Sequence, residues 1–156
     1  MKTIYLAGPI TGLTFQQASH GWRQDVEAWL FKRGLLDKVQ LLSPLRGKEY
    51  LADQGVLAKQ YLNLHPLSSP QGIVRRDYND VITCDAVLAN FFGATKVSLG
   101  TAWEMGVAYA HQKPVVAIIE ENSCHDHPFI TQTASYTFEY MGDSALEALM
   151  LLIGVR

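Results

Sequence analysis

The chain has 156 residues, which is enough for one domain that buries its own core. Its 13 basic and 15 acidic residues are mixed along the sequence and give a formal net charge of −2, which excludes the basic footprint of a protein that binds nucleic acid or an anionic membrane. We therefore expect a single domain over residues 1–156 whose partner is a small molecule.

The cysteines and the apolar runs indicate the cellular compartment of the protein. Cys84 and Cys124 lie in unrelated contexts, without the spacing of a zinc knuckle or of a disulfide framework. The apolar run over residues 2–7 is too short for a signal peptide, and no stretch approaches the roughly 20 apolar residues that span a bilayer. These features predict a soluble cytoplasmic protein.

The first elements in the chain form a strand followed by a helix. Residues 3–7 are a short apolar run closed by Gly8 and Pro9, which predicts a buried parallel strand. From residue 15 onward, apolar side chains recur at spacings of three and four, which predicts one amphipathic helix ending at Gly34. The side chains with this spacing are Phe15, Ala18, Trp22, Val26, Trp29 and Leu30.

Residues 39–43 predict a second strand that ends before Pro44. The segment 46–72 keeps only part of a helical rhythm and is interrupted by prolines, serines and a glycine. It is long compared with the connections of about 4–6 residues that are typical of compact domains. We therefore interpret it as an insertion with a short helix that covers the site.

The second half of the chain continues the alternation of helices and strands. It predicts helices over residues 73–84, 101–111 and 144–153, and strands over residues 86–92, 114–119 and 136–138. Such alternation implies an α/β fold, with a doubly wound, mainly parallel five-stranded sheet and helices on both faces, of the flavodoxin-like or Rossmann-like type.

Doubly wound sheets bind ligands beyond the carboxyl ends of their strands. This rule selects the turn 8–12, the loop 90–100 and the loop 120–128. The glycines of the turn let the backbone approach a sugar or phosphate closely, although the turn is neither a dinucleotide fingerprint nor a P-loop. An ordinary turn at a strand end explains it equally well.

Glu104 lies in the first turn of the helix that leaves the second of these loops. Thr101 and Glu104 have the spacing of a capping box, in which the glutamate reaches back to the backbone at the start of the helix. The pattern alone favours this interpretation, because capping boxes are commoner than active sites. A carboxylate at the mouth of a cleft can instead act as a nucleophile towards an anomeric carbon.

A second carboxylate is needed to assist the leaving group in such chemistry. Asp77 and Asp80 are candidates, although their helical pattern also suits a solvated face with local ion pairs. Asp85 has the position of a turn or capping residue. His125 and His127 form only a weak metal ligand set, and we predict no metal site.

Several segments together resemble the nucleoside 2-deoxyribosyltransferase superfamily, over most of the chain apart from residues 46–72. They are IYLAGPI (4–10), RD (76–77), CDAVLAN (84–90), SLGTAWEMGVA (98–108) and KPVV (113–116). The resemblance implies an enzyme without a cofactor that cleaves the N-glycosidic bond of nucleosides or nucleoside 5′-monophosphates. It assigns the nucleophile that forms a glycosyl-enzyme to Glu104, assistance of the leaving base to Asp77, and positioning of the glutamate to Tyr5.

Two branches of the superfamily differ at the residue six before the glutamate. The transferases carry an aspartate that holds the sugar hydroxyls, and the related 5′-monophosphate N-hydrolases carry a serine that contacts phosphate. Ser98 therefore resembles the hydrolases, whereas Pro9 and Thr11 stand where those hydrolases carry a serine and an arginine. Arg75, Arg76 or Lys96 would have to compensate. The substrate-binding residues implied on this chain are Gly8, Pro9, Ile10, Thr11, Ser98 and Gly100.

The resemblance also implies a homodimer or higher homo-oligomer in which a neighbouring subunit completes each active site. The loop that would do so contains Asn122 and His127, which we include among the substrate-binding candidates.

The first expectation is hydrolysis of a 2′-deoxynucleoside 5′-monophosphate or deoxynucleoside, with release of the free base. Transfer of the deoxyribosyl group between bases is the alternative within the same chemistry. A non-catalytic nucleotide-binding module, with Glu104 as a helix cap, is the alternative from another class.

Overall fold

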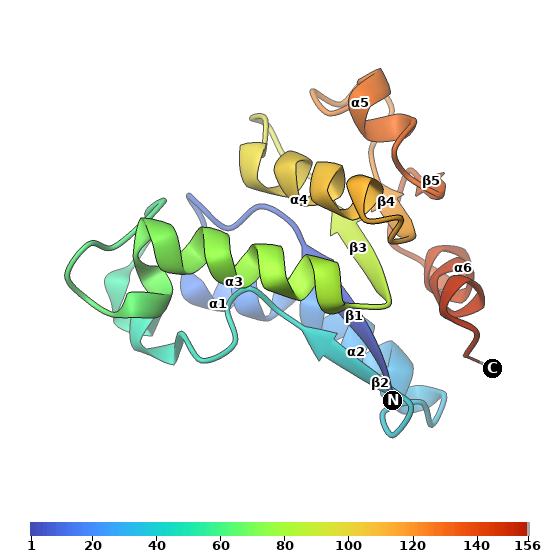
Figure 1. Ribbon diagram of the computed structural model, residues 1–156, viewed down its shortest axis with the longest axis horizontal. Coiled ribbons are helices and arrows are strands. Elements are labelled where there is room, and N and C mark those ends of the chain that lie inside the picture. The colour runs from blue at the N-terminus through green and yellow to red at the C-terminus, as the bar shows by residue number, and fades with distance from the viewer. Residues whose placement is uncertain (156) are drawn as a thin grey trace.

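The computed structural model describes residues 1–155 and contains one five-stranded sheet (Figure 1). Arg156, the last residue of the expected domain, lies outside the described residues. The strands run β2-β1-β3-β4-β5 across the sheet, and every neighbouring pair is parallel. They are β1 (Lys2–Ala7), β2 (Val39–Leu42), β3 (Ala86–Asn90), β4 (Val115–Ile118) and β5 (Tyr136–Phe138). The expected α/β fold is confirmed, with a sheet that is entirely parallel.

Helices cover both faces of the sheet, as Figure 1 shows. They are α1 (Phe15–Ser19), α2 (Gly21–Lys32), α3 (Pro70–Thr83), α4 (Leu99–Ala110), α5 (Pro128–Thr131) and α6 (Asp143–Ile153), with 3₁₀ turns η1 (Glu49–Gln54) and η2 (Pro66–Ser68). Helices α2 and α6 pack on one face, whereas α3, α4 and α5 pack on the other. None of the helices in residues 1–155 is long and apolar enough to cross a membrane.

Alternating side chains of the central strands point into two separate cores. Ile4 and Leu6 of β1 contact the core under α2 and α6, and Tyr5 and Ala7 contact the core under α3 and α4. Because both faces are buried, the strand has apolar side chains at successive positions rather than at every second one. This is why the continuous apolar runs of the sequence predicted the central strands correctly.

The helix expected over residues 15–34 is instead two helices, α1 and α2, which meet at His20. Gly21 has a φ of +36°, a value that glycine adopts without steric cost. Apolar spacing continues across the break, so the periodicity did not show it. Helix α3 likewise begins at Pro70, earlier than expected, because a proline is well suited to the first helical position after the Ser69 cap.

The segment 46–72 lies beside the loop that follows β1. The backbone N–H of Leu57 donates to the carbonyl of Leu13 at 2.7 Å, and Gly12 donates to the carbonyl of Leu57 at 2.9 Å. Leu45, Leu51 and Leu57 form a third apolar cluster with Ala18 of α1. These contacts hold the segment over the carboxyl ends of β1 and β2.

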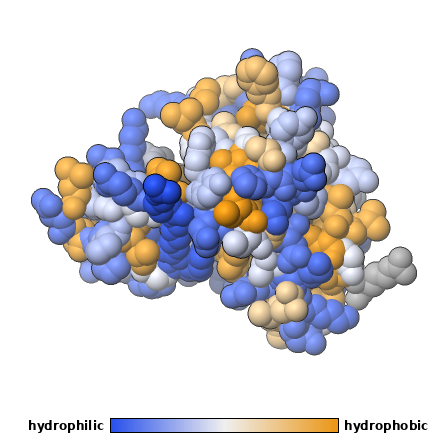
Figure 2. All heavy atoms as spheres, viewed as in Figure 1, coloured by the Kyte–Doolittle hydropathy of each residue, from blue (hydrophilic) through white to orange (hydrophobic). Residues whose placement is uncertain are grey.

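The outer faces of α3 and α4 carry exposed apolar side chains, namely Val74, Leu99, Trp103 and Tyr109. Figure 2 shows apolar residues gathered near the middle of this side of the molecule, with hydrophilic residues around them. The strand order places the switch point of the doubly wound sheet between β1 and β3, where a ligand crevice is expected.

Candidate active site

A cavity of about 590 Å³ opens at this switch point. Residues from the loop after β1, the segment 46–72, α3 and the start of α4 line it. The lining includes eight of the residues expected from the sequence: Gly8, Pro9, Ile10, Thr11, Asp77, Ser98, Gly100 and Glu104. The fold therefore brings together residues that are far apart in the chain.

Tyr5 and Glu104 form a buried hydrogen bond at this cavity. The phenol of Tyr5 donates to Glu104 Oε1 at 2.7 Å, and the tyrosine is fully buried. Burial, followed by the nearby charge of Glu104, raises the pKa of Tyr5 well above its usual value, so the phenol keeps its proton. The hydrogen bond can therefore orient the carboxylate, as the sequence resemblance implied.

The capping interpretation of Glu104 is wrong. Helix α4 begins at Leu99 with Ser98 as the N-cap, so Glu104 lies beyond the first turn and its side chain bonds to Tyr5. The hydroxyl of Thr101 instead lies 2.9 Å from that of Ser98. Helix α4 therefore starts two residues earlier than the capping pattern predicted.

The solvated-face interpretation of Asp77 and Asp80 is also wrong, because both side chains are buried on α3. Asp80 accepts a bidentate pair of bonds from Arg46, each of 2.6 Å. Asp77 lines the cavity, and its buried Oδ1 has no hydrogen-bond partner among residues 1–155. The Asp77 carboxyl at the cavity therefore has hydrogen-bonding capacity that no protein group uses.

Burial sets the protonation of the two cavity carboxyls. Desolvation, and then the charge of Asp77, raises the pKa of Glu104 to about 8. Desolvation also raises the pKa of Asp77 to about 6, although the nearby Lys48 ammonium opposes this rise. Between these values the pair holds one proton, which lies mainly on Glu104 because its pKa is the higher of the two, and the hydrogen bond from Tyr5 increases the share of molecules in which Glu104 is ionised.

Arg23 is a site residue that sequence reasoning missed. It is 3% exposed and donates to the backbone carbonyls of Leu6, Gly8 and Ala18 from beneath the first loop. A Cβ on Gly8 would lie 3.0 Å from the carbonyl oxygen of Asn90, so only glycine leaves this approach free. Arg23 lies three residues before Val26 and seven residues before Leu30, which are both buried. This helical spacing was the signal in the sequence that predicts a buried position for Arg23.

The loop after β3 is supported from the loop after β4. The backbone N–H of Ser98 donates to Nε2 of buried His125 at 2.8 Å, and the His125 ring packs on Phe91. His127 instead accepts a bond from the Phe129 N–H as the N-cap of α5. Residues 1–155 contain no group of three side chains placed to hold a metal ion.

Asn122 and His127 do not line the cavity of their own chain.

Asp85 accepts hydrogen bonds from Lys2 and from the backbone and hydroxyl of Thr3, so it holds the start of β1 rather than capping a helix.

Of the three cationic residues that the sequence suggested, only Lys96 lines the cavity, and two further lysines join it. Lys96 lines it, as do Lys48 and Lys59 of the segment 46–72. Arg75 is exposed on α3 and lies outside the lining, and Arg76 donates to the carbonyl of Arg46.

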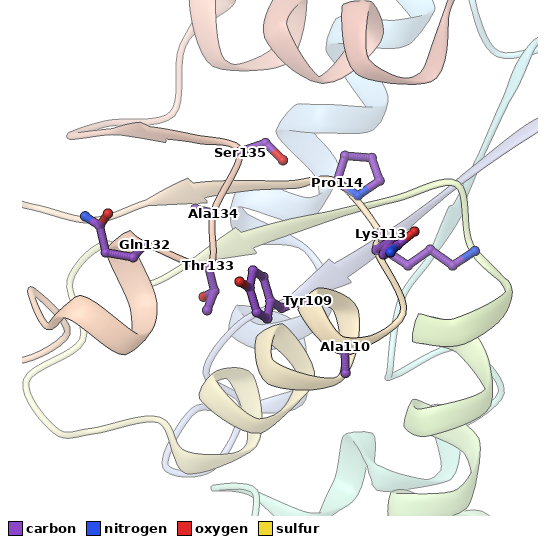
Figure 3. Close-up of a pocket in the computed structure, with 9 residues that line it drawn as sticks. Tyr109, Ala110, Lys113, Pro114, Gln132, Thr133, Ala134 and Ser135 are labelled. Atoms are coloured by element: carbon purple, nitrogen blue, oxygen red, sulfur yellow. The ribbon is translucent and has the colours of Figure 1, made fainter.

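A second hollow, of about 600 Å³, lies at the opposite end of the sheet. Figure 3 shows it between the end of α4, with Tyr109 and Ala110, and the segment with Thr133 and Ser135 that leads into β5. It contains none of the expected site residues, and it lies at the amino ends of the strands, away from the switch point. We therefore place the candidate active site at the first cavity.

Comparison with known proteins identifies the family of the chain. The family model of nucleoside 2-deoxyribosyltransferase matches residues 4–146. Solved structures with the same fold include a conserved protein from Enterococcus faecalis V583, with 22% identity, a TM-score of 0.54, and coverage of 97% of this chain and 87% of that one. The sequence matches no curated protein.

Two further structures have names that state an activity. The CMP N-glycosidase of Clostridium botulinum is 19% identical, with a TM-score of 0.56 and coverage of 96% of this chain and 99% of that one. The 2-desoxiribosyltransferase of Leishmania mexicana is 18% identical, with a TM-score of 0.51 and coverage of 97% of each chain. At these identities the structures establish a shared fold, whereas the family match covers most of the sequence. The chain belongs to the nucleoside 2-deoxyribosyltransferase family and is an enzyme of the glycosyl hydrolase or transferase class.

Proposed function

We propose that this chain cleaves the N-glycosidic bond of a 2′-deoxynucleoside 5′-monophosphate, with Glu104 as the nucleophile. The observation that carries the proposal is the buried Glu104 carboxylate, which lines the cavity and is held by Tyr5 at 2.7 Å. Asp77 lines the same cavity and has an unpaired oxygen. Glycosidases that retain the configuration of the anomeric carbon generally use two carboxyl groups in different environments.

The reaction would proceed in two displacements. In the first, a Glu104 oxygen bonds to the anomeric carbon, the carbon–nitrogen bond breaks with its electron pair going to the base, and Asp77 donates a proton to the base. In the second, water attacks the anomeric carbon, the ester to Glu104 breaks, and the proton of the water returns to Asp77. The products are the free base and deoxyribose 5-phosphate, and both carboxyls regain their first state.

The start of α4 would receive the phosphate. This helix has 12 residues, and Ser98, Leu99 and Gly100 at its amino end all line the cavity. Unpaired N–H groups at a helix start favour an anion, and Lys96 in the preceding loop adds a positive charge. Gly8, Pro9, Ile10 and Thr11 would hold the sugar from the other side of the cavity floor.

The test is release of free base from a panel of deoxynucleotides and deoxynucleosides, measured by chromatography. We expect Glu104→Gln to lower turnover by at least about a thousandfold, because no nucleophile remains. Glu27→Gln makes the same chemical change on the exposed face of α2 and should keep full activity. The proposal would be refuted if the unmodified protein released no base from any substrate of the panel, or if Glu104→Gln kept full activity.

Transfer of the deoxyribosyl group to another base is the second candidate, favoured by the family match. Both reactions share the glycosyl-enzyme, and they differ in whether water or a base attacks it. Adding a free acceptor base to the reaction separates them, because transfer yields a new nucleoside. A non-catalytic module with Glu104 as a cap has lost its structural basis, since Glu104 does not cap α4.

We further propose a single domain in which residues 46–72 cover the active site, and a homo-oligomer in the cytoplasm. The cover is supported by its contacts with the loop after β1. Exposed apolar residues on α3 and α4 offer a surface for another subunit, which would also bring Asn122 or His127 to a neighbouring site. Both cysteines are unpaired, as suits a reducing compartment.

A further inference from the structure

Lys48 is a buried cation in the cavity with no role in the reaction described so far. Its side chain is 5% exposed and lines the cavity together with Asp77 and Glu104. Its ammonium makes no ion pair with residues 1–155, and it is not among the side-chain atoms that are buried without a partner, so it keeps contact with the cavity. An ammonium at the cavity with no protein partner has three donors available to a ligand.

The fold fixes the backbone around Lys48. Arg46 is held to α3 by its two bonds to Asp80, and Arg76 of α3 donates to the carbonyl of Arg46. The N–H of Lys48 donates to the carbonyl of Leu45 at 3.0 Å. Lys48 is therefore anchored to the helix that carries Asp77, although it lies in a segment of irregular structure.

Lys48 lies across the cavity from the proposed phosphate position. The strand order β2-β1-β3 places β1 in the middle, with the loop after β2 on one side and the loop after β3 on the other. Lys48 follows β2, whereas Lys96 and Ser98 follow β3. Among the attractive charges on Lys48, Asp77 is the strongest, which places the lysine near the group that would assist the leaving base.

We propose that Lys48 binds the leaving base by donating a hydrogen bond to a carbonyl oxygen of the base, and that it stabilises the negative charge which collects there as the glycosidic bond breaks. This inference rests on the proposed function and adds a substrate class to it. An ammonium has three donors and no acceptor, so it pairs with a carbonyl and not with an amino group. Adenine is the common base without a carbonyl and offers an ammonium only its ring nitrogens, which do not collect charge as a carbonyl oxygen does, and we therefore expect a preference for nucleotides of cytosine, thymine, uracil or guanine.

The test compares Lys48→Met and Lys48→Arg with the unmodified enzyme on all five deoxynucleoside monophosphates. Methionine keeps a long apolar stem, so thermal melting should show a folded protein. We expect Lys48→Met to lower kcat/KM for the carbonyl-bearing substrates by roughly 10- to 100-fold, mainly through kcat, because the charge develops in the transition state. Lys48→Arg should restore part of the loss. Lys32→Met, on the exposed end of α2, is the matched control.

The outcomes separate this inference from the function on which it rests. Absence of base release by the unmodified enzyme would refute the proposed function itself. Active enzyme with unchanged kcat/KM in Lys48→Met, or unmodified enzyme that prefers the adenine nucleotide, would refute the role of Lys48 alone. An equal loss on every base, with the limb near pH 6 moved upward, would show that Lys48 acts only through the pKa of Asp77 and would refute its contact with the base.

Discussion

Replacing Glu104 by glutamine should stabilise the folded protein at alkaline pH while it abolishes activity. The pKa of Glu104 is raised from its ordinary value of 4.5 to about 8, mainly by burial. Between these values the native state holds a proton that the unfolded chain has released, so the free energy of unfolding falls as pH rises. A glutamine cannot ionise, and its carbonyl can still accept the hydrogen bond from Tyr5.

The size of the effect follows from the pKa. Each pKa unit corresponds to about 1.4 kcal/mol, so ionised Glu104 lowers the free energy of unfolding by up to about 5 kcal/mol above pH 8. Relaxation around the charge reduces this ceiling, and we expect Glu104→Gln to be more stable than the unmodified protein by roughly 2–5 kcal/mol at pH 8.5. At pH 4 the difference should be close to zero, because Glu104 is then protonated in both states.

Urea unfolding followed by circular dichroism at pH 4 and pH 8.5 measures both values. Glu27→Gln serves as the control, because Glu27 is exposed and its replacement should change stability little at either pH. A stability difference between Glu104→Gln and the unmodified protein that is the same at both pH values would refute the reasoning. So would an unmodified protein that is the more stable of the two at pH 8.5.

Three further predictions concern the active site and the assembly. The profile of kcat/KM against pH should be bell-shaped, with limbs near 6 and 8 and a maximum near 7, because the reactive pair of Asp77 and Glu104 then holds one proton. Tyr5→Phe should lower kcat by roughly 10- to 100-fold and move the limb near pH 8 to higher pH, because the hydrogen bond that lowers the pKa of Glu104 is lost. Light scattering should show a dimer or larger assembly, and a charge introduced by Trp103→Glu on the exposed apolar face should weaken it.

Each of these has an outcome that contradicts it. A rate that rises steadily from pH 5 to 9 would exclude the one-proton pair. An unshifted limb near pH 8 in Tyr5→Phe would mean that the phenol does not control ionisation of the glutamate. A monomer at micromolar concentration would remove the basis for a shared active site.

Much of the fold followed from the sequence because its central strands are buried on both faces. The runs that became β1, β3 and β4 are apolar at successive positions, and such runs in alternation with helices leave few arrangements open. The break at His20 was missed because apolar spacing continues through it. The early start of α4 was missed because Thr101 and Glu104 imitate a capping box that does not form.

The candidate site was predicted in part. The catalytic roles of Asp77 and Glu104 came from a family resemblance. The sequence alone also allowed a solvated helix face for Asp77, which its burial excluded, and a helix cap for Glu104, which the start of α4 and the bond to Tyr5 excluded. The burial of Arg23 could have been predicted from the sequence, since an arginine at helical spacing from buried apolar residues suggests a buried cation. Lys48 could not be predicted, because its segment keeps only part of a helical rhythm, from which the direction of a side chain cannot be inferred.

The sequence by itself determined the order of strands and helices, the parallel sheet, and the presence of a glutamate beyond the third strand. Tertiary structure decided what that glutamate is: it joins Tyr5, which is 99 residues away in the chain, and it buries the carboxyl beside Asp77. The pKa of a carboxyl depends on its exclusion from water and on its distance to other charges. Apolar periodicity records only which side of an element is buried, so it carries neither quantity.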